Sequence, residues 1–414
     1  MYLRPMEVIR FSLKNGIRVV HLPMNRPVAH CGIFINAGSR DESEREQGMA
    51  HFIEHMMFKG TQKRKAYHIL SRMEDVGGEL NAFTGKEDTT LHASFLYEYF
   101  PRAIELLSDI LLNPAFPEKE IQKEKAVVID EIQSYKDAPG ELIFDDFEEL
   151  LFPDDAIGRN ILGTPKKVRA FKGPMLHEFR QRRYAASEIV FASVGNISEA
   201  KLRKYLEQYL GERELPAARP KMRPSLTAYR PEKKLVKKKT FQSHCVIGNR
   251  CYNAFDERLT AMALLNNLLG GPGMNSRLNL NIRERYGFTY HIESYYQAYS
   301  DSGVFGIYLG TDKGQMARSI ELVEKELKGL SEKPLGILQL SKAKKQLLGQ
   351  LAIATENNGS LMLALGKSVL QRDEVERLEE LTLKVEQVSA SDVIEIAGDV
   401  FDRNQLSTLI YQAK

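Results

Sequence analysis

GMAHFIEHMMFKG, residues 48–60, is the most informative stretch of this chain. Its apolar residues surround three polar ones, as in a buried helix, and Gly60 is a suitable stop for that helix. His51 and His55 are four residues apart, so the two imidazoles lie on one helical face and can converge on one cation. Glu54 lies on the same side of the helix and can reach a water molecule bound to that cation.

The spacing His-x-x-Glu-His favours a zinc site over a chance arrangement. Imidazole nitrogens and carboxylate oxygens are common zinc ligands, and a catalytic zinc keeps one position open for water. The order of the residues is the inverted form of a motif found in many zinc proteases. Two purely structural histidines are the alternative. That alternative is disfavoured because burying these polar groups among Met, Phe and Ile is costly unless they are paired or bound to a metal.

A third protein ligand is expected, and a carboxylate is the natural choice. The helical pattern over residues 119–135 is the best source, because Glu124 and Glu131 are seven residues apart and share one face. The same face carries Val127 and Val128, which predicts that it points inward. Spacing alone does not choose between Glu124 and Glu131.

The composition indicates a soluble protein of two or more domains, with 414 residues and an apolar fraction of 43%. The net charge is only +3 and the charges are interspersed, so we expect no nucleic-acid partner. Three cysteines do not make a disulfide framework, and Cys31 and Cys245 are predicted to be core residues. The chain shows no signal peptide and no stretch long enough to span a membrane, so we expect a cytoplasmic location and no membrane partner.

The second half of the chain resembles the first, which indicates an internal duplication. Residues 28–33 are similar to residues 242–247, and residues 102–106 are similar to residues 318–322. The similar segments occur in the same order in both halves. On this alignment, the three positions of the metal motif fall on Leu264, Asn267 and Leu268. The second half therefore has the fold without the metal chemistry.

A short charged segment between the halves carries four prolines, Pro216, Pro220, Pro224 and Pro231, and is the best linker candidate. We predict an α+β fold of two homologous domains, each a mainly antiparallel sheet packed with helices. The predicted boundaries are a zinc-binding catalytic domain at 1–215, a linker at 216–234 and a homologous domain without metal at 235–414.

Two further stretches carry distinctive patterns. They are GGELNAFT at residues 77–84 and IRERYGFTY at residues 282–290. Together with the metal motif, they resemble the pitrilysin/insulysin family of zinc peptidases. The resemblance is to the short branch that includes the β-subunit of the mitochondrial processing peptidase and its bacterial homologues, and it covers nearly the whole chain.

The resemblance selects the third ligand. In that family it is a glutamate about 76 residues after the second histidine, and Glu131 follows His55 by that interval. Glu124 matches a second acidic position of the family, and a residue at that position supports the metal ligands without binding the metal itself. One zinc ion per chain, bound by His51, His55 and Glu131, is what the resemblance implies.

The resemblance also assigns the substrate contacts. Asn81 and Ala82 would lie on an edge strand beside the metal and hold the substrate backbone, since a peptide can add to such an edge as another strand. The alternative for Asn81 is a turn residue. Arg283 and Tyr290 would contact the substrate opposite the zinc, where both can donate to a developing oxyanion.

The implied function is hydrolysis of peptides or unfolded segments inside a chamber between the halves. Water activated by the zinc would attack, and Glu54 would act as the general base. Since one chain carries both the metal motif and the Arg283–Tyr290 pair, the resemblance implies a complete enzyme, acting as a homodimer on peptide substrates. The alternatives are a non-catalytic peptide-binding or assembly scaffold of the same fold and a metal hydrolase that acts on other substrates.

Overall fold

The computed structural model describes residues 7–218 and 226–414. These residues form two compact units, and neither unit is a continuous stretch of sequence. Unit 1 consists of residues 7–133, 159–218 and 354–375. Unit 2 consists of residues 134–158, 226–353 and 376–414.

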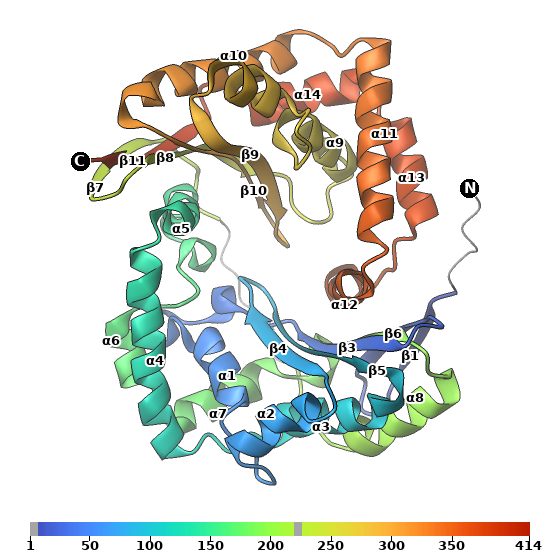
Figure 1. Ribbon diagram of the computed structural model, residues 1–414. Coiled ribbons are helices and arrows are strands. Elements are labelled where there is room, and N and C mark those ends of the chain that lie inside the picture. Colours follow the sequence, from blue (N-terminus) through green and yellow to red (C-terminus); the bar gives the residue numbers. More distant parts are fainter. Residues whose placement is uncertain (1–6, 219–225) are drawn as a thin grey trace. The chain divides into compact units, whose positions relative to one another are not determined.

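Unit 1 contains a six-stranded sheet with helices packed on it (Figure 1). Its strands are β1 (Ile9–Ser12), β2 (Arg18–Pro23), β3 (Val28–Ile35), β4 (Glu79–Thr84), β5 (Thr89–Leu96) and β6 (Ile189–Gly195). Its helices are α1 (Met49–Met57), α2 (Ala66–Glu74), α3 (Phe100–Leu112), α4 (Glu118–Lys136), α6 (Pro165–Ala170), α7 (Gly173–Arg183), α8 (Glu199–Leu206) and α12 (Asn358–Arg372). The last residues of α4 cross the boundary into unit 2.

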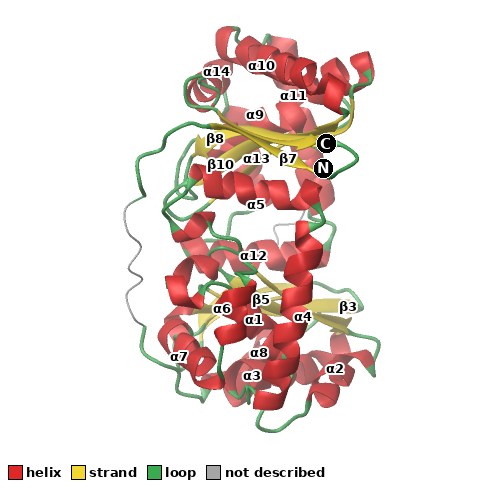
Figure 2. Ribbon diagram, turned by 90° about the vertical axis from the view of Figure 1, so that its left-hand side faces the viewer, coloured by secondary structure: helices red, strands yellow, loops and turns green. Residues whose placement is uncertain are grey.

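Unit 2 contains a five-stranded sheet, and Figure 2 shows helices beside the strands of each unit. Its strands are β7 (Lys233–Lys238), β8 (Ser243–Cys251), β9 (Thr289–Ala298), β10 (Gly303–Thr311) and β11 (Ser407–Ala413). Its helices are α5 (Pro139–Leu151), α9 (Leu259–Gly270), α10 (Met316–Glu332), α11 (Ile337–Ala354), α13 (Leu378–Gln387) and α14 (Ala390–Val400).

The two sheets share one topology. In unit 1 the order is β1-β2-β6-β3-β5-β4, with β2 and β6 parallel and the other neighbours antiparallel. In unit 2 the order is β7-β11-β8-β10-β9, with β7 and β11 parallel and the other neighbours antiparallel. Unit 2 thus repeats the last five strands of unit 1 in order and direction, as a duplication produces. The predicted α+β class with mainly antiparallel sheets is confirmed.

Strand β6 shows how both faces of the unit 1 sheet become buried. The predicted strand over residues 189–195 is confirmed, and each of its residues is buried. Because side chains alternate along a strand, Ile189 and Phe191 join the core beneath the sheet, while Val190 and Ala192 join a second core on the opposite face. A strand buried on both faces is a nearly continuous apolar run, and the sequence shows one here.

Helix α12 covers the second face of that sheet. Met362, Leu365 and Val369 follow one another at helical spacing and pack in the same cluster as Phe34 of β3. Gly366 allows the close approach, because a Cβ at this position would lie only 2.2 Å from the ring of Phe34. Helix α12 therefore docks closely on a sheet that comes from the other half of the chain.

Helix α5 makes the reciprocal contact in unit 2. Ile143 and Phe147 pack with Val246 of β8 and Leu409 of β11 in one buried cluster. Helix α5 follows α4 in the sequence, and α12 follows α11. The first half of the chain therefore supplies α5, which covers one face of the sheet in unit 2. The second half supplies α12, which covers one face of the sheet in unit 1.

The predicted domains at 1–215 and 235–414 are two continuous halves of the sequence. These boundaries stay a prediction. The compact units differ from these halves by the exchanged segments 134–158 and 354–375. Within the predicted linker at 216–234, residues 219–225 lie outside the described residues.

The buried cysteines match the sequence analysis, because Cys31 and Cys245 are both fully buried in the cores. None of the helices in residues 7–218 and 226–414 combines the length and the apolar character that crossing a membrane requires.

His21 predicts how the stability of the fold depends on pH. It is fully buried in β2, where Nε2–H donates to the Ile197 carbonyl (3.1 Å) and Nδ1 accepts from the Ser193 hydroxyl (2.9 Å). Burial lowers the pKa of His21, although the Ile197 carbonyl, the backbone of Ser193 and the charge of Glu199 act in the opposite direction. Folding therefore favours the neutral form of this histidine, whereas the unfolded chain takes up a proton below about pH 6.5.

The contribution of His21 to stability is therefore complete above about pH 6.5 and is lost as the pH falls below it. At pH 5.5 we expect a loss of at most about 1.4 kcal/mol from this one group. Urea unfolding of the metal-free protein at pH 8 and pH 5.5 measures it, and His21→Asn should show the smaller pH dependence. The same pH dependence in wild type and His21→Asn would contradict the assignment, and His68→Asn on the surface is the control.

Candidate metal centre

The start of α1 is held by a buried carboxylate. Glu42 accepts hydrogen bonds from the backbone N–H groups of Gly48 (2.8 Å) and Ala50 (2.7 Å), which a helix start leaves without helical partners. Gly48 has a left-handed φ of 91°, and a Cβ there would lie 2.7 Å from the Leu162 carbonyl oxygen. Burial raises the pKa of Glu42, although the two N–H groups oppose this effect. The helix that carries the motif is therefore anchored at its first turn.

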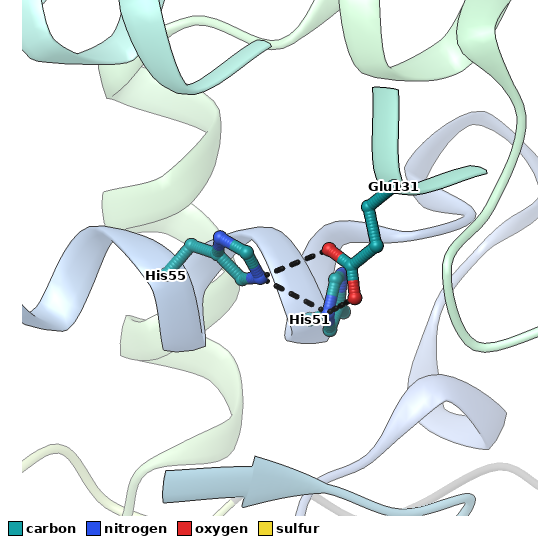
Figure 3. Close-up of side chains that lie close together, drawn as sticks. All are labelled: His51, His55 and Glu131. Atoms are coloured by element: carbon teal, nitrogen blue, oxygen red, sulfur yellow. Dashed lines mark hydrogen bonds and ion pairs between the residues drawn. The ribbon is translucent and has the colours of Figure 1, made fainter. Parts of the chain in front are cut away.

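His51 and His55 converge as their spacing predicts. Their Nε2 atoms lie 3.2 Å apart, and the rings meet edge to face. Glu131 approaches from α4, with Oε2 3.3 Å from Nε2 of His55 and Oε1 3.7 Å from Nε2 of His51. Figure 3 shows the two imidazoles and the carboxylate pointing toward one another. Their ligand atoms all lie within 4.8 Å of one another, so these residues could hold one metal ion.

The chemistry of this cluster fits zinc. Two imidazole nitrogens and one carboxylate oxygen form a donor set typical of a zinc site that keeps a position for water. Burial lowers the pKa of His51 to about 3, and the neighbouring His55 acts in the same direction. His51 is therefore neutral at physiological pH, which is the form that binds a metal. Within residues 7–218 and 226–414, this is the one cluster of three such ligands.

Glu124 lies behind His55, on the side away from Glu131. Its Oε1 accepts a hydrogen bond from Nδ1–H of His55 at 2.8 Å, and its Oε2 lies 2.8 Å from Nζ of Lys59. Burial raises the pKa of Glu124, but the hydrogen bonds from His55 and Lys59 outweigh it and the net shift is downward. The bond at Nδ1 leaves the lone pair of Nε2 directed at the cluster.

The packing of α4 separates the two carboxylates that spacing left equivalent. The buried face of α4 runs through Ile121, Glu124, Val128 and Ile132. Glu131 lies at the edge of this face, and its side chain is 42% exposed, so it reaches the cluster from the solvent side. The prediction that Val127 points inward is wrong, because Val127 is 49% exposed. The helix presents a narrower stripe to the core than the pair of valines suggests.

Glu54 lies on α1 directly before His55 and is half-buried. Burial raises the pKa of its carboxyl group. The charge of Glu131 adds to this effect, and the charge of His55 opposes it. The structure thus keeps a third carboxyl group beside the cluster, as the motif predicts.

Asn81 and Ala82 lie within β4, which pairs with β5 and forms one edge of the sheet. Strand β4 also packs beside α1. Asn81 is exposed, and its Oδ1 accepts the N–H of Ala82 at 2.9 Å. The alternative of a turn residue for Asn81 is wrong, because the residue is in the middle of the strand.

Arg283 and Tyr290 belong to unit 2. Arg283 lies in a π-helical segment, Asn279–Glu284, and Tyr290 lies on the edge strand β9 with 81% exposure. The guanidinium carbon is 5.3 Å from the centroid of the Tyr290 ring, a cation–π contact. The two residues that the resemblance assigns to the substrate are therefore neighbours.

Two residues of this centre escaped the sequence analysis. Lys59 follows His55 by four residues, so helical spacing could have placed it beside the same face. Glu42 lies before α1, separated from it by the short 3-10 helix Glu44–Glu46, and no local pattern indicates that its carboxylate bonds to the helix start.

Two family models match the chain. Residues 18–165 match the model described as Insulinase (Peptidase family M16), and residues 172–347 match the Peptidase M16 inactive domain. The metal cluster is contributed by residues of the first match.

Curated relatives cover nearly the whole chain. The chain is 33% identical over 403 residues to the "Uncharacterized zinc protease YmxG" of Bacillus subtilis, which covers 97% of each protein. An "Uncharacterized zinc protease" of Streptomyces coelicolor is 34% identical over 413 residues, covering 97% of this chain and 89% of that protein.

Solved structures share the fold. A protease from Helicobacter pylori matches with a TM-score of 0.90 at 18% identity, covering 98% of this chain and 99% of that chain. A putative M16-like peptidase from Alicyclobacillus acidocaldarius also has a TM-score of 0.90, at 17% identity and with full coverage of both chains.

Proposed function

The chain belongs to the insulinase family of zinc proteases, peptidase family M16, and we propose that it is an endopeptidase or oligopeptidase that cleaves peptides and unfolded segments. The observation that carries the proposal is the convergence of His51, His55 and Glu131 at the anchored helix α1. A degenerate scaffold would have little reason to keep two buried imidazoles and a carboxylate aimed at one point.

We assign His51, His55 and Glu131 as the ligands of one zinc ion per chain. Zinc held there would acidify the attacking water and polarise the carbonyl group of the scissile bond. The protein's part is to present two imidazoles and one carboxylate in a fixed arrangement. Glu124 contributes by holding the ring of His55 through Nδ1.

Glu54 is the proposed general base. It is the one carboxylate of the motif that the ligand set does not use, and it lies on α1 beside His55. In this role it accepts a proton from the attacking water and passes it to the amine that leaves.

The outer edge of the sheet, at β4, is the proposed place of the peptide backbone. A substrate strand that adds to this edge would bond through main-chain groups, which gives affinity for many sequences. Asn81 and Ala82 would hold it there, and the position of β4 beside α1 supports this assignment. The contacts of Arg283 and Tyr290 with substrate, the homodimer and the cytoplasmic location stay predictions.

A comparison of substrate classes tests the proposal. Wild-type protein loaded with zinc is incubated with a pool of quenched peptides, with carboxylic esters and with nucleotides. We expect cleavage of peptides and no turnover of the other two classes. Turnover of esters or nucleotides alone would favour a hydrolase of another kind, and peptide binding without any cleavage would favour the scaffold.

A further inference from the structure

The basic side chains on α1 and just after it form one continuous row with carboxylates of α4. His51, His55 and Lys59 follow one another at intervals of four residues, so they share one side of α1 and of the turn after it. Glu124 and Glu131 are seven residues apart on α4, which is two helical turns. Glu131 lies against both histidines, and Glu124 lies against His55 and Lys59.

The proposed function uses every member of this row except Lys59. Its ammonium nitrogen lies 2.8 Å from Oε2 of Glu124, and Oε1 of the same carboxylate accepts Nδ1–H of His55 at 2.8 Å. Among the described residues, each oxygen of Glu124 has one such partner. The side chain of Glu124 is only 4% exposed, so water does not readily replace a partner that is removed.

We propose that Lys59 is a positioning residue of the metal centre, which holds the Glu124 carboxylate where it binds Nδ1–H of His55 and so directs Nε2 at the metal. The inference rests on the metal-binding part of the proposed function. An imidazole that donates from Nδ1 carries its lone pair on Nε2, and the partner at Nδ1 fixes the orientation of the ring. Lys59 acts one contact further out, by restraining that partner.

A purely structural role for Lys59 would have different consequences. A cation after the last turn of a helix stabilises the helix, and an ammonium group stabilises a buried carboxylate. Either effect changes the free energy of unfolding. Neither one predicts that the influence of Lys59 on zinc affinity depends on the charge of Glu124.

A double-mutant cycle separates these roles. The zinc dissociation constant is measured by competition with a chelating indicator for wild type, Lys59→Met, Glu124→Gln and the double variant. We expect Lys59→Met to weaken zinc binding about tenfold in the wild-type background and less than about twofold in the Glu124→Gln background, because a neutral amide needs no ammonium partner. Lys59→Arg should restore most of the affinity. Lys123→Met is the control, since Lys123 is an exposed residue of α4 that pairs with Glu120.

Each outcome bears on a separate claim. An unchanged affinity in Lys59→Met, or an equal loss in both backgrounds, overturns the inference and leaves the proposed function intact. A wild-type protein that binds no zinc overturns both. Urea unfolding of the metal-free proteins runs alongside, and Lys59→Gln replaces Lys59→Met in the cycle if the latter does not fold.

Discussion

Replacing Glu54 by Gln should abolish most peptide cleavage while leaving zinc bound. Glutamine keeps the size of the side chain but cannot take a proton from the attacking water. General acid–base catalysis of this kind contributes about 10²–10⁴-fold, and we expect kcat to fall within that range. The ligand atoms of His51, His55 and Glu131 are untouched, so the zinc affinity should stay within about threefold of wild type.

The measurement is steady-state cleavage of a quenched peptide by proteins whose zinc content has been determined. Glu74→Gln is the matched control, because Glu74 is an exposed glutamate on the neighbouring helix α2. Cleavage at the wild-type rate by Glu54→Gln would remove Glu54 from the mechanism. A loss of zinc together with activity would show that Glu54 supports the metal and would leave the base unassigned.

Separating the two halves of the chain should leave neither half folded. Residues 1–218 lack α12, and residues 226–414 lack α5. Four apolar side chains of α12 are buried in unit 1: Met362, Leu365, Val369 and Leu370. At about 1.5–3 kcal/mol each, they contribute roughly 6–12 kcal/mol, which is comparable to the whole stability of a typical domain.

Production of the halves in separate and in shared cultures tests this expectation. Alone, each half should aggregate or show no cooperative unfolding, and together they should form a soluble complex of one copy each.

In the full-length chain, Leu365→Asp places a charge in the buried cluster and should lower the free energy of unfolding by several kcal/mol. Ala364→Asp, next to it on the exposed side of α12, should cost less than about 1 kcal/mol. A first half that is monomeric and cooperative alone would contradict the exchange of helices.

Local periodicity predicts those features of this protein that depend on neighbours in sequence. The spacing of His51 and His55 follows from one helical turn, and the apolar run at residues 189–195 is enough to predict β6. The choice of Glu131 over Glu124 depends on how α4 docks against α1. Both carboxylates satisfy the helical period, so only the resemblance or the structure separates them.

The exchange of α5 and α12 shows why the sequence does not predict which segments make up each unit. The sequence of an amphipathic helix reveals that it has an apolar face, but the pattern does not predict which of two similar sheets that face will cover. Two duplicated sheets offer two equivalent partners. The same limit explains Glu42, whose bond to the start of α1 closes a loop that no periodic pattern describes.

The most direct test of this account is the zinc content of the purified protein, measured together with peptide cleavage before and after chelation. The account predicts about one zinc per chain, loss of cleavage on removal of the metal and recovery when zinc is returned, with manganese and cobalt as comparisons. Glu131→Gln should lose most of the zinc, whereas Asp130→Asn, on the exposed side of α4, should keep it. A wild-type protein without bound zinc, or zinc content that is unchanged by Glu131→Gln, would contradict it.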